Sequence, residues 1–549
     1  MTSPPCRSRR ERGARVLLGA WLLGTALFGC TPEPRELALL GTPGPWPWVS
    51  GLVSHGDRLW LANSVKHEEH NSADLYSYDP RSGEFRYERH LFSQGIGRPV
   101  ELDSLLFWPY EDSRFHLGIG HLVVTDGERW ELRVIREARL KHLHGLIASQ
   151  GRLLAAASWL SPRLLASADH GRSWDLLYGP PSPVGRVDRI LRLAELSGSL
   201  YGVRVRGLRR GPHHLVHLGA EGPRVATGWP EGELRGVATA GGWLHAVVVE
   251  ADGRGLWRTD GRVSERLGDG PPGVRDLAVD ASGNLWALAA QRKGGAVWKQ
   301  EPDGGWKLEA KVSGGLPQEI HLYGGHPYVA GRAAGGSGAL WGPAPPAPPE
   351  PTLRPPKLLA QRSRAVVDWP EAGRALDAAL ADPRSYEEGA RPLVELLLPL
   401  ALAGPPQGFF SGRLDTSFPD GVADLLEGRG PAARWQDLGV WALLWAMTVS
   451  GTGPVPLEWL AEPWTQPPND RQKYFDPLPA ALEALAWVGQ RDARTLGALV
   501  ERLGSENDPD WLTGDVVGAL AALTGERFGH DVAAWRGWWA GRNRAPPTE

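Results

Sequence analysis

Gly283-Asn284-Leu285-Trp286 has the pattern of a tight turn that contains glycine and leads at once into an apolar strand. Similar turns recur along the chain, and their equivalent positions fall at residues 59, 106, 153, 200, 244, 285 and 327. Successive positions lie 41 to 47 residues apart. A period in the forties with about four short strands per unit is what one propeller blade requires. The repeat therefore predicts an all-β propeller with seven blades.

Further segments, at the right phase of this repeat, read as the outer hairpins of the blades. Residues 75–83, 125–130 and 297–306 each join two strand-like runs through Pro, Asp or Gly turn residues. The segment 167–174, with the sequence SADHGRSW, resembles the Asp-box of sialidase-like propellers. We expect a structural role for its members, because the carboxylate can accept from turn amides, the glycine takes a conformation closed to other residues, and the tryptophan packs between sheets. These members are Ser167, Asp169, Gly171 and Trp174.

The Asp-box also raises the possibility of sialidase chemistry. Such an enzyme needs an arginine trio for the substrate carboxylate, a tyrosine nucleophile activated by glutamate, and an acidic aspartate. The Arg-Ile-Pro motif that opens the first blade of that family is absent, and Arg98-Pro99-Val100 is a poor substitute. We therefore assign no catalytic residue and keep a carbohydrate-active enzyme, acting at the axial face, as the alternative.

Histidines are the other candidates for chemistry. His142 and His144 lie two residues apart in a strand-like run, so they point to one face, and His321 holds a comparable place in the last unit. We expect these three to line the propeller axis as polar residues. The segment 66–71, KHEEHN, is expected to be a solvated loop, and His213, His214 and His217 are expected at the surface. No metal site and no cofactor is predicted.

The last unit, from Leu316 to Trp341, has room for only about three strands. An open edge there would expose unpaired N–H and C=O groups. The apolar stretch Arg35–Leu40 has no other obvious partner. We expect it to add the outer strand to this last blade and so close the ring.

Composition marks where the propeller ends. Eight prolines fall in the fourteen residues 343–356, which is typical of an extended spacer. We predict a propeller over residues 30–342, a proline-rich linker over 343–357 and an α-helical domain over 358–549. The chain's 549 residues are enough for several domains.

The helical part shows its clearest pattern near the C-terminus. Helices are expected over 478–488, 493–503, 511–523 and 532–540, with Gly525 ending one and Asp531 capping the next. Together with the tryptophans at 535, 538 and 539, this segment resembles the closing unit of bacterial HEAT-like repeat proteins. The resemblance implies packing and interaction, not catalysis.

The N-terminal residues have the features of a targeting signal. Five arginines precede an apolar run that ends in Leu27-Phe28-Gly29-Cys30, and this resembles a bacterial lipoprotein signal. The run is too short to span a bilayer, so it is expected to be removed as a signal peptide over residues 1–29. Cys30 would carry the lipid, and Thr31 after it favours the outer membrane. Removal of the signal would take the formal charge from −3 to −7, which argues against nucleic acid as a partner.

The expected protein is thus a lipid-anchored, two-domain protein of the cell envelope. Because no reactive constellation is visible, we expect it to bind or scaffold an envelope protein or a polysaccharide. A binding protein and a carbohydrate-active enzyme would differ in the side chains that line the axis. A convergent set of acids and arginines there would favour an enzyme, whereas an exposed apolar patch would favour a binding protein.

Overall fold

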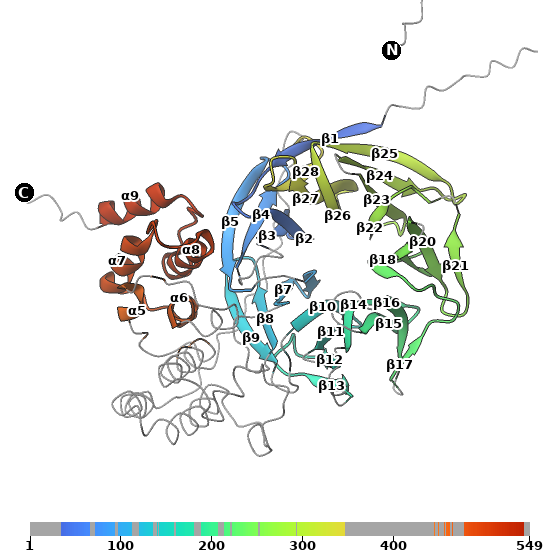
Figure 1. Ribbon diagram of the computed structural model, residues 1–549, viewed down its shortest axis with the longest axis horizontal. Helices are drawn as coiled ribbons and strands as arrows, with labels where there is room; N and C mark the ends of the chain where they lie inside the picture. The colour runs from blue at the N-terminus through green and yellow to red at the C-terminus, as the bar shows by residue number, and fades with distance from the viewer. Residues whose placement is uncertain are drawn as a thin grey trace, which may run out of the picture. The chain divides into compact units, whose positions relative to one another are not determined.

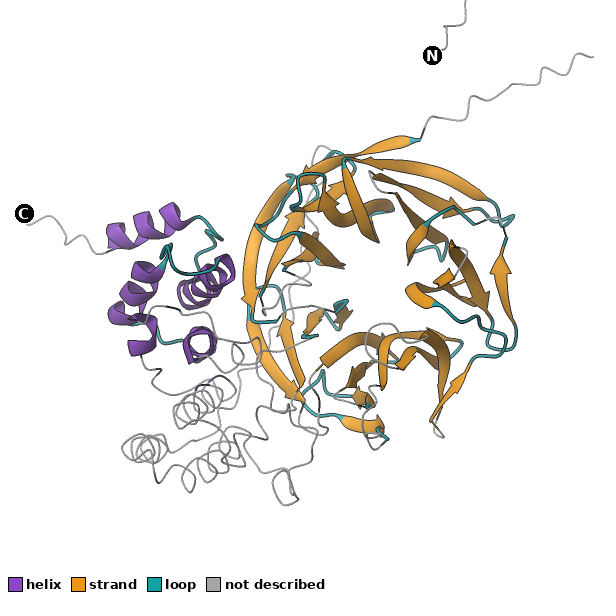
Figure 2. Ribbon diagram, viewed as in Figure 1, coloured by secondary structure: helices purple, strands orange, loops and turns teal. Residues whose placement is uncertain are grey.

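The strands form sheets arranged in a ring about a common axis (Figure 1), and the described helices all belong to the C-terminal part of the chain (Figure 2). This computed structural model describes residues 34–345 with short gaps, a few positions between 444 and 464, and residues 477–542. Five sheets have four strands each, paired in chain order from the inside outward. Their strands are β2 Trp48–His55, β3 Arg58–Ser64, β4 Ala73–Asp79, β5 Glu84–Leu91; β6 Val100–Leu102, β7 Leu105–Pro109, β8 Gly120–Thr125, β9 Trp130–Ile135; β10 His142–Ser149, β11 Arg152–Ser158, β12 Pro162–Ser167, β13 Asp175–Tyr178; β14 Asp188–Leu196, β15 Ser199–Arg206, β16 His213–Gly219, β17 Gly222–Val225; and β18 Glu233–Ala240, β19 Trp243–Glu250, β20 Gly253–Thr259, β21 Ser264–Leu267.

The remaining strands form one sheet of eight. Its order is β22-β23-β24-β25-β1-β28-β27-β26. The strands are β1 Arg35–Gly41, β22 Val274–Val279, β23 Leu285–Gln291, β24 Gly294–Gln300, β25 Trp306–Ser313, β26 Gly315–Tyr323, β27 His326–Ala333 and β28 Gly338–Gly342. The expectation of seven separate blades is therefore wrong, because only five four-stranded sheets are separate. The physical reason is β1, which pairs with strands on both of its sides and joins the last two repeat units into one sheet.

The repeat itself marks strands correctly. Its seven positions fall in β3, β7, β11, β15, β19, β23 and β27, each just after a tight turn. Several turn glycines take the left-handed conformation that the turn needs, for example Gly151 with φ +72° and Gly198 with φ +77°. The expected outer hairpins are also present, at β4–β5, β8–β9, β12–β13 and β24–β25.

The predicted closure by the N-terminal segment is confirmed. Strand β1 pairs antiparallel with β28, with Ala38 opposite Gly342 and Leu39 opposite Trp341. The preceding residues of β1, 35–37, have no partner in β28 and pair in parallel with β25, with Leu37 opposite Val312. Because both ends of the eight-stranded sheet are innermost strands, β22 and β26, this sheet has no free outer edge.

The described helical region is smaller than predicted. A short helix α5, Glu458–Ala461, precedes α6 Pro477–Val488, α7 Ala493–Arg502, α8 Asp510–Thr524 and α9 Val532–Arg542. The four longer helices match the expected ranges. Gly525 ends α8 in the left-handed conformation, and Asp531 Oδ1 accepts the N–H of Ala534 at the start of α9. The HEAT-like identity stays a prediction.

Several predicted features lie outside the described residues. These are the signal peptide at 1–29 with Cys30, most of the linker, the loop 66–71 and the segment 358–443. Among the helices that are described, none has the length and apolar character needed to cross a membrane.

The closure predicts a contrast between two neighbouring leucines of β1. Leu37 is 5% exposed and belongs to the apolar cluster of β23 to β28, whereas Leu39 is 54% exposed. Leu37→Ala should lower the free energy of unfolding by about 2–5 kcal/mol, because it leaves a cavity between two repeat units. Leu39→Ala should change it by less than about 0.5 kcal/mol. Urea unfolding of the two variants measures the difference, and equal losses would contradict the closure.

Candidate functional site

The innermost strands are irregular where they line the axis. Bulges or register shifts interrupt the pairing of six of them with their neighbours, near the start of each strand. They fall between Ser50 and Val53, Leu143 and Gly145, Ile190 and Leu193, Leu234 and Val237, Val274 and Asp276, and Pro317 and Glu319. These shifts leave backbone N–H groups without a ladder partner. In the described part of the chain, side chains from neighbouring units reach three of these strands near the shift: Glu319 reaches β2, Asp276 reaches β26 and His213 reaches β18.

Glu319 of β26 holds the first unit to the last. Its Oε2 accepts the N–H of Gly51 at 2.9 Å, and its Oε1 accepts that of Leu52 at 3.1 Å. Both amides belong to the bulge in β2. The carboxylate therefore ties together repeat units that lie at opposite ends of the propeller sequence.

Asp276 of β22 makes the equivalent contact one unit earlier. Its Oδ2 accepts the N–H of Ile320 at 3.1 Å and also a hydrogen bond from the guanidinium of Arg98. The Nε of Arg98 lies 3.7 Å from Glu319, so one arginine bridges both carboxylates. Arg98 has a structural place at the axis, although the sequence identified it only as a poor motif match.

Arg192 in the bulge of β14 completes this axial group. Burial, together with the positive charge of Arg98, lowers its pKa to about 10, while Asp276 and Glu319 oppose that shift. The axis thus brings arginines and acids together, as an enzyme would require. Both acids, however, accept N–H donors from neighbouring strands, and these hydrogen bonds hold the carboxylates in fixed positions.

The three histidines predicted to line the axis do not form one cluster. His142 and His144 are together, with ring centroids 5.4 Å apart, and the Nε2 of His144 lies 2.8 Å from Ser158 Oγ. His321 instead contacts Ser54, with Nε2 2.6 Å from Oγ. Burial lowers the pKa of His144 to about 3 and that of His321 to about 4, so both rings are neutral at pH 7.

The prediction that His213, His214 and His217 lie at the surface is wrong for one of them. His213, expected at the surface, is buried in β16, and its Nδ1 accepts the N–H of Leu234 at 3.1 Å. The surface prediction is wrong for this residue because its ring bridges to the next unit. Within the described part of the chain, no group of three His, Cys, Asp or Glu side chains is placed to hold a metal ion.

Residues 167–174, which resemble an Asp-box in sequence, form the turn between β12 and β13. Asp169 Oδ1 accepts the N–H groups of Arg172 at 3.0 Å and Ser173 at 2.9 Å, and these bonds lower its pKa against the effect of burial. Ser167 Oγ accepts the N–H of Gly171, whose φ is +85°. Trp174 is buried and its indole donates to the Gly171 carbonyl. All of these contacts hold the turn itself.

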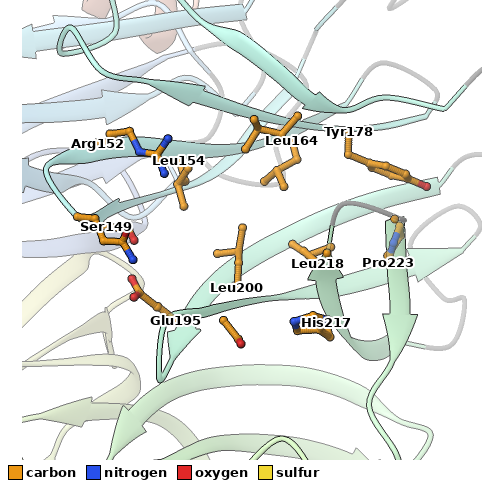
Figure 3. Close-up of a pocket in the computed structure, with 16 residues that line it drawn as sticks. Ser149, Arg152, Leu154, Leu164, Tyr178, Glu195, Leu200, His217, Leu218 and Pro223 are labelled. Carbon is orange, nitrogen blue, oxygen red and sulfur yellow. The ribbon is translucent and has the colours of Figure 1, made fainter.

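A groove of about 500 Å³ lies between the β10–β13 and β14–β17 blades. Figure 3 shows Arg152, Ser149 and Glu195 at one end, and Tyr178 and Pro223 at the other. The leucines among the lining residues are Leu154, Leu164, Leu177, Leu200 and Leu218. Such a mixture of apolar and polar groups is found in binding sites. No sequence pattern predicts this groove, because its leucines come from five different strands.

A buried polar cluster joins the first blade to the helical region. His90 of β5 lies between two carboxylates, with Nδ1 2.8 Å from Asp74 Oδ1 and Nε2 2.9 Å from Asp515 Oδ1. His530 Nε2 lies 2.8 Å from Asp74 Oδ2. Helix α8 reaches His90 because position 518 is glycine, where a Cβ would clash with the histidine. Its members are up to 456 residues apart in the chain, so the sequence analysis missed it.

No family model matches the chain, and no curated protein matches it. The similar solved structures include a luciferin-regenerating enzyme, 14% identical, for which 46% of this chain and 91% of that chain are covered with a TM-score of 0.32. The computationally designed Ika8 protein is 10% identical, with 56% and 99% covered and a TM-score of 0.38. The WD40 domain of Neurospora crassa Pan2 is 9% identical, with 57% and 97% covered and a TM-score of 0.39. These similarities do not extend to function.

The His90 cluster predicts a pH dependence of stability. Burial alone would lower the pKa of His90, but hydrogen bonds with Asp515 and Asp74 raise it from 6.5 to about 9. The protonated ring therefore stabilises the fold fully below pH 6.5, and this contribution is lost as the pH rises through 9. Between these values the wild type should lose on the order of 3 kcal/mol more unfolding free energy than His90→Gln.

At acidic pH, the contribution of Asp74 to stability falls as the pH falls, opposite to the behaviour of His90. Burial would raise the pKa of Asp74, but His530 and His90 outweigh it and hold the pKa well below its usual range. Its contribution is present above about pH 4 and is lost as the pH falls further. Urea unfolding from pH 3 to 9.5 measures both arms, with His326→Gln, at an exposed position, as the control. Identical pH profiles for wild type and His90→Gln would refute the assignment.

Proposed function

We propose that the protein is a lipid-anchored binding module of the cell envelope, and that its ligand is another protein held in the groove between the β10–β13 and β14–β17 blades. The observation that carries this proposal is that five leucines line the groove, beside polar residues such as Arg152, Glu195 and His217. The groove has a volume of about 500 Å³. Apolar side chains of a protein would gain free energy by burial against these leucines.

The alternative is a carbohydrate-active enzyme at the axis. It has some support, because Arg98, Arg192, Asp276 and Glu319 converge there. Glycoside hydrolysis needs one carboxyl group that donates a proton and a second that acts as base or nucleophile. Asp276 and Glu319 already accept backbone N–H groups that hold the repeat units together. We therefore assign these acids a structural role and place the function in binding.

The envelope location rests on the N-terminal sequence. Leu27-Phe28-Gly29-Cys30 is the site at which a lipoprotein signal would be cleaved and the cysteine acylated. Two acyl chains are what stable attachment needs. Threonine at position 31 favours the outer membrane, and strand β1 begins only four residues later, so the propeller would lie close to that surface.

The anchor predicts a change of cell fraction. The wild type should sediment with the membranes and be released by detergent. Cys30→Ser should move the protein to the soluble fraction, because serine cannot be acylated through a thioether. A Cys30→Ser protein that stays in the membrane fraction would place the anchor elsewhere.

The binding proposal predicts a site-specific crosslink. A photoreactive amino acid at Leu177, which is 51% exposed in the groove, should crosslink to one protein in intact membranes. The same amino acid at Val263, which is 57% exposed and does not line the groove, should not. Leu200→Arg should abolish the crosslink at Leu177. Release of reducing sugar from envelope polysaccharide by the purified protein would instead support the enzyme.

A further inference from the structure

We infer that the bulges of three neighbouring innermost strands form a second binding site, in which Arg192, Arg235 and Arg275 hold a phosphate group. None of these arginines lines the groove between the β10–β13 and β14–β17 blades. The inference therefore goes beyond the proposed function and does not depend on it. It starts from the residues that the bulges in β14, β18 and β22 carry.

Each of these three bulges contributes one arginine. Arg192 lies in the bulge of β14, Arg235 in that of β18 and Arg275 in that of β22. A bulge takes a residue out of the regular ladder and re-aims its side chain. The three strands follow one another around the ring (Figure 1), so arginine occupies the same irregular place in three consecutive repeat units.

The next innermost strand carries an N–H donor at the same place. Gln318 is the extra residue in the bulge of β26. Its Nε2 is buried and has no hydrogen-bond partner in the part of the chain that the structure describes. Four successive bulges thus present side chains that donate hydrogen bonds.

Two of the three guanidinium groups lack a counter-charge. Arg192 and Arg275 are partly buried, and within the described ranges neither makes a hydrogen bond, an ion pair or a ring contact. Arg235 forms an ion pair with Glu233 of its own strand, with 2.8 Å between Nη2 and Oε1. Removing a charge from water is costly unless a partner compensates for the lost hydration. A bound anion would compensate both Arg192 and Arg275.

The nearby acids already have other partners. Asp276 accepts hydrogen bonds from Arg98 and from the N–H of Ile320. Glu319 accepts two N–H groups of β2 and lies 3.7 Å from the Nε of Arg98. Both carboxylates are therefore held by groups other than the two unpaired arginines.

The local charge is positive. The charged groups that act on Arg192 and Arg275 are Arg98, Arg235, Arg254, Glu233, Asp276 and Glu319. With Arg192 and Arg275 themselves, five arginines face three carboxylates, which leaves a surplus of two positive charges. Burial, and after it the neighbouring arginines, lowers the pKa of both groups. The chain as a whole has a formal charge of −3, so the surplus is specific to this place.

A phosphate group matches this surplus in charge and in shape. It carries a charge of about −2 at pH 7 and has acceptor oxygens on several sides. The planar fork of a guanidinium binds a pair of phosphate oxygens. Forks from three different strands suit a tetrahedral group better than a carboxylate, whose oxygens lie in one plane. The phosphate is either free or the end group of a larger molecule, because both present the same oxygens.

Isothermal titration of the purified full-length protein with inorganic phosphate, at neutral pH and constant ionic strength, tests the site. Phosphate should bind wild type at least tenfold more tightly than acetate does. Arg192→Gln and Arg275→Gln should each weaken phosphate binding at least tenfold. The matched control is Arg262→Gln, at an exposed position between β20 and β21, which should bind phosphate as wild type does.

Melting temperatures separate a binding role of Arg192 from a structural one. Without phosphate, Arg192→Gln should melt at or above the temperature of wild type, because it removes a charge that has no partner among the described residues. Saturating phosphate should raise the melting temperature of wild type but not that of Arg192→Gln. A lower melting temperature of Arg192→Gln without phosphate would show that this arginine holds the fold, and would overturn the assignment.

Methyl phosphate distinguishes the two sources of the ligand. Binding as tight as that of inorganic phosphate would identify a phosphate ester, and binding at least tenfold weaker would identify free phosphate; either result supports the site. Three results would overturn it: no binding of phosphate to wild type, phosphate binding that Arg192→Gln and Arg275→Gln leave unchanged, or tighter binding of acetate than of phosphate.

Discussion

Unpaired strand edges are the constraint on which this structure depends. A ring of sheets exposes the outer edge of every blade, and each edge presents N–H and C=O groups that favour further pairing. The chain meets this constraint at the junction of its first and last strands, where β1 pairs with both β25 and β28 and leaves the eight-stranded sheet without an outer edge. Near the axis, Glu319 joins the same ends of the ring by accepting N–H groups from β2.

The edge strand β5 is covered in a different way. Helix α8 packs on it, and the buried ring of His90 lies between carboxylates from β4 and α8. A second ion pair, between Arg527 and Glu88 of β5, lies on the same strand at 2.6 Å. Burying such charges is costly unless each is paired, so this arrangement favours one defined position of helix α8 against β5. Strand β13 has no such cover among the described residues, and its exposed Leu177 lines the groove.

The sequence predicted what depends on local pattern. The turn before Leu285 and its relatives located the second strand of every unit, and the hairpin around Asp169 and the cap at Asp531 follow from residues that are neighbours in the chain. Leucine-rich Arg35–Leu40 was found as the closing strand because the last unit lacked one. The features that the sequence did not predict depend on contacts between distant parts of the chain. The second pairing of β1, with β25, changed the number of separate sheets. The groove and the His90 cluster combine residues that share no sequence motif.

Strand β1 closes the ring by pairing with β28 on one side and with β25 on the other. Amide hydrogen exchange of the free full-length protein can detect this closure. The amides of residues 310–312 in β25, next to β1, should exchange at least tenfold more slowly than those of residues 175–178 in β13, which is a terminal strand of its sheet. Equal protection of the two strands would contradict the closure.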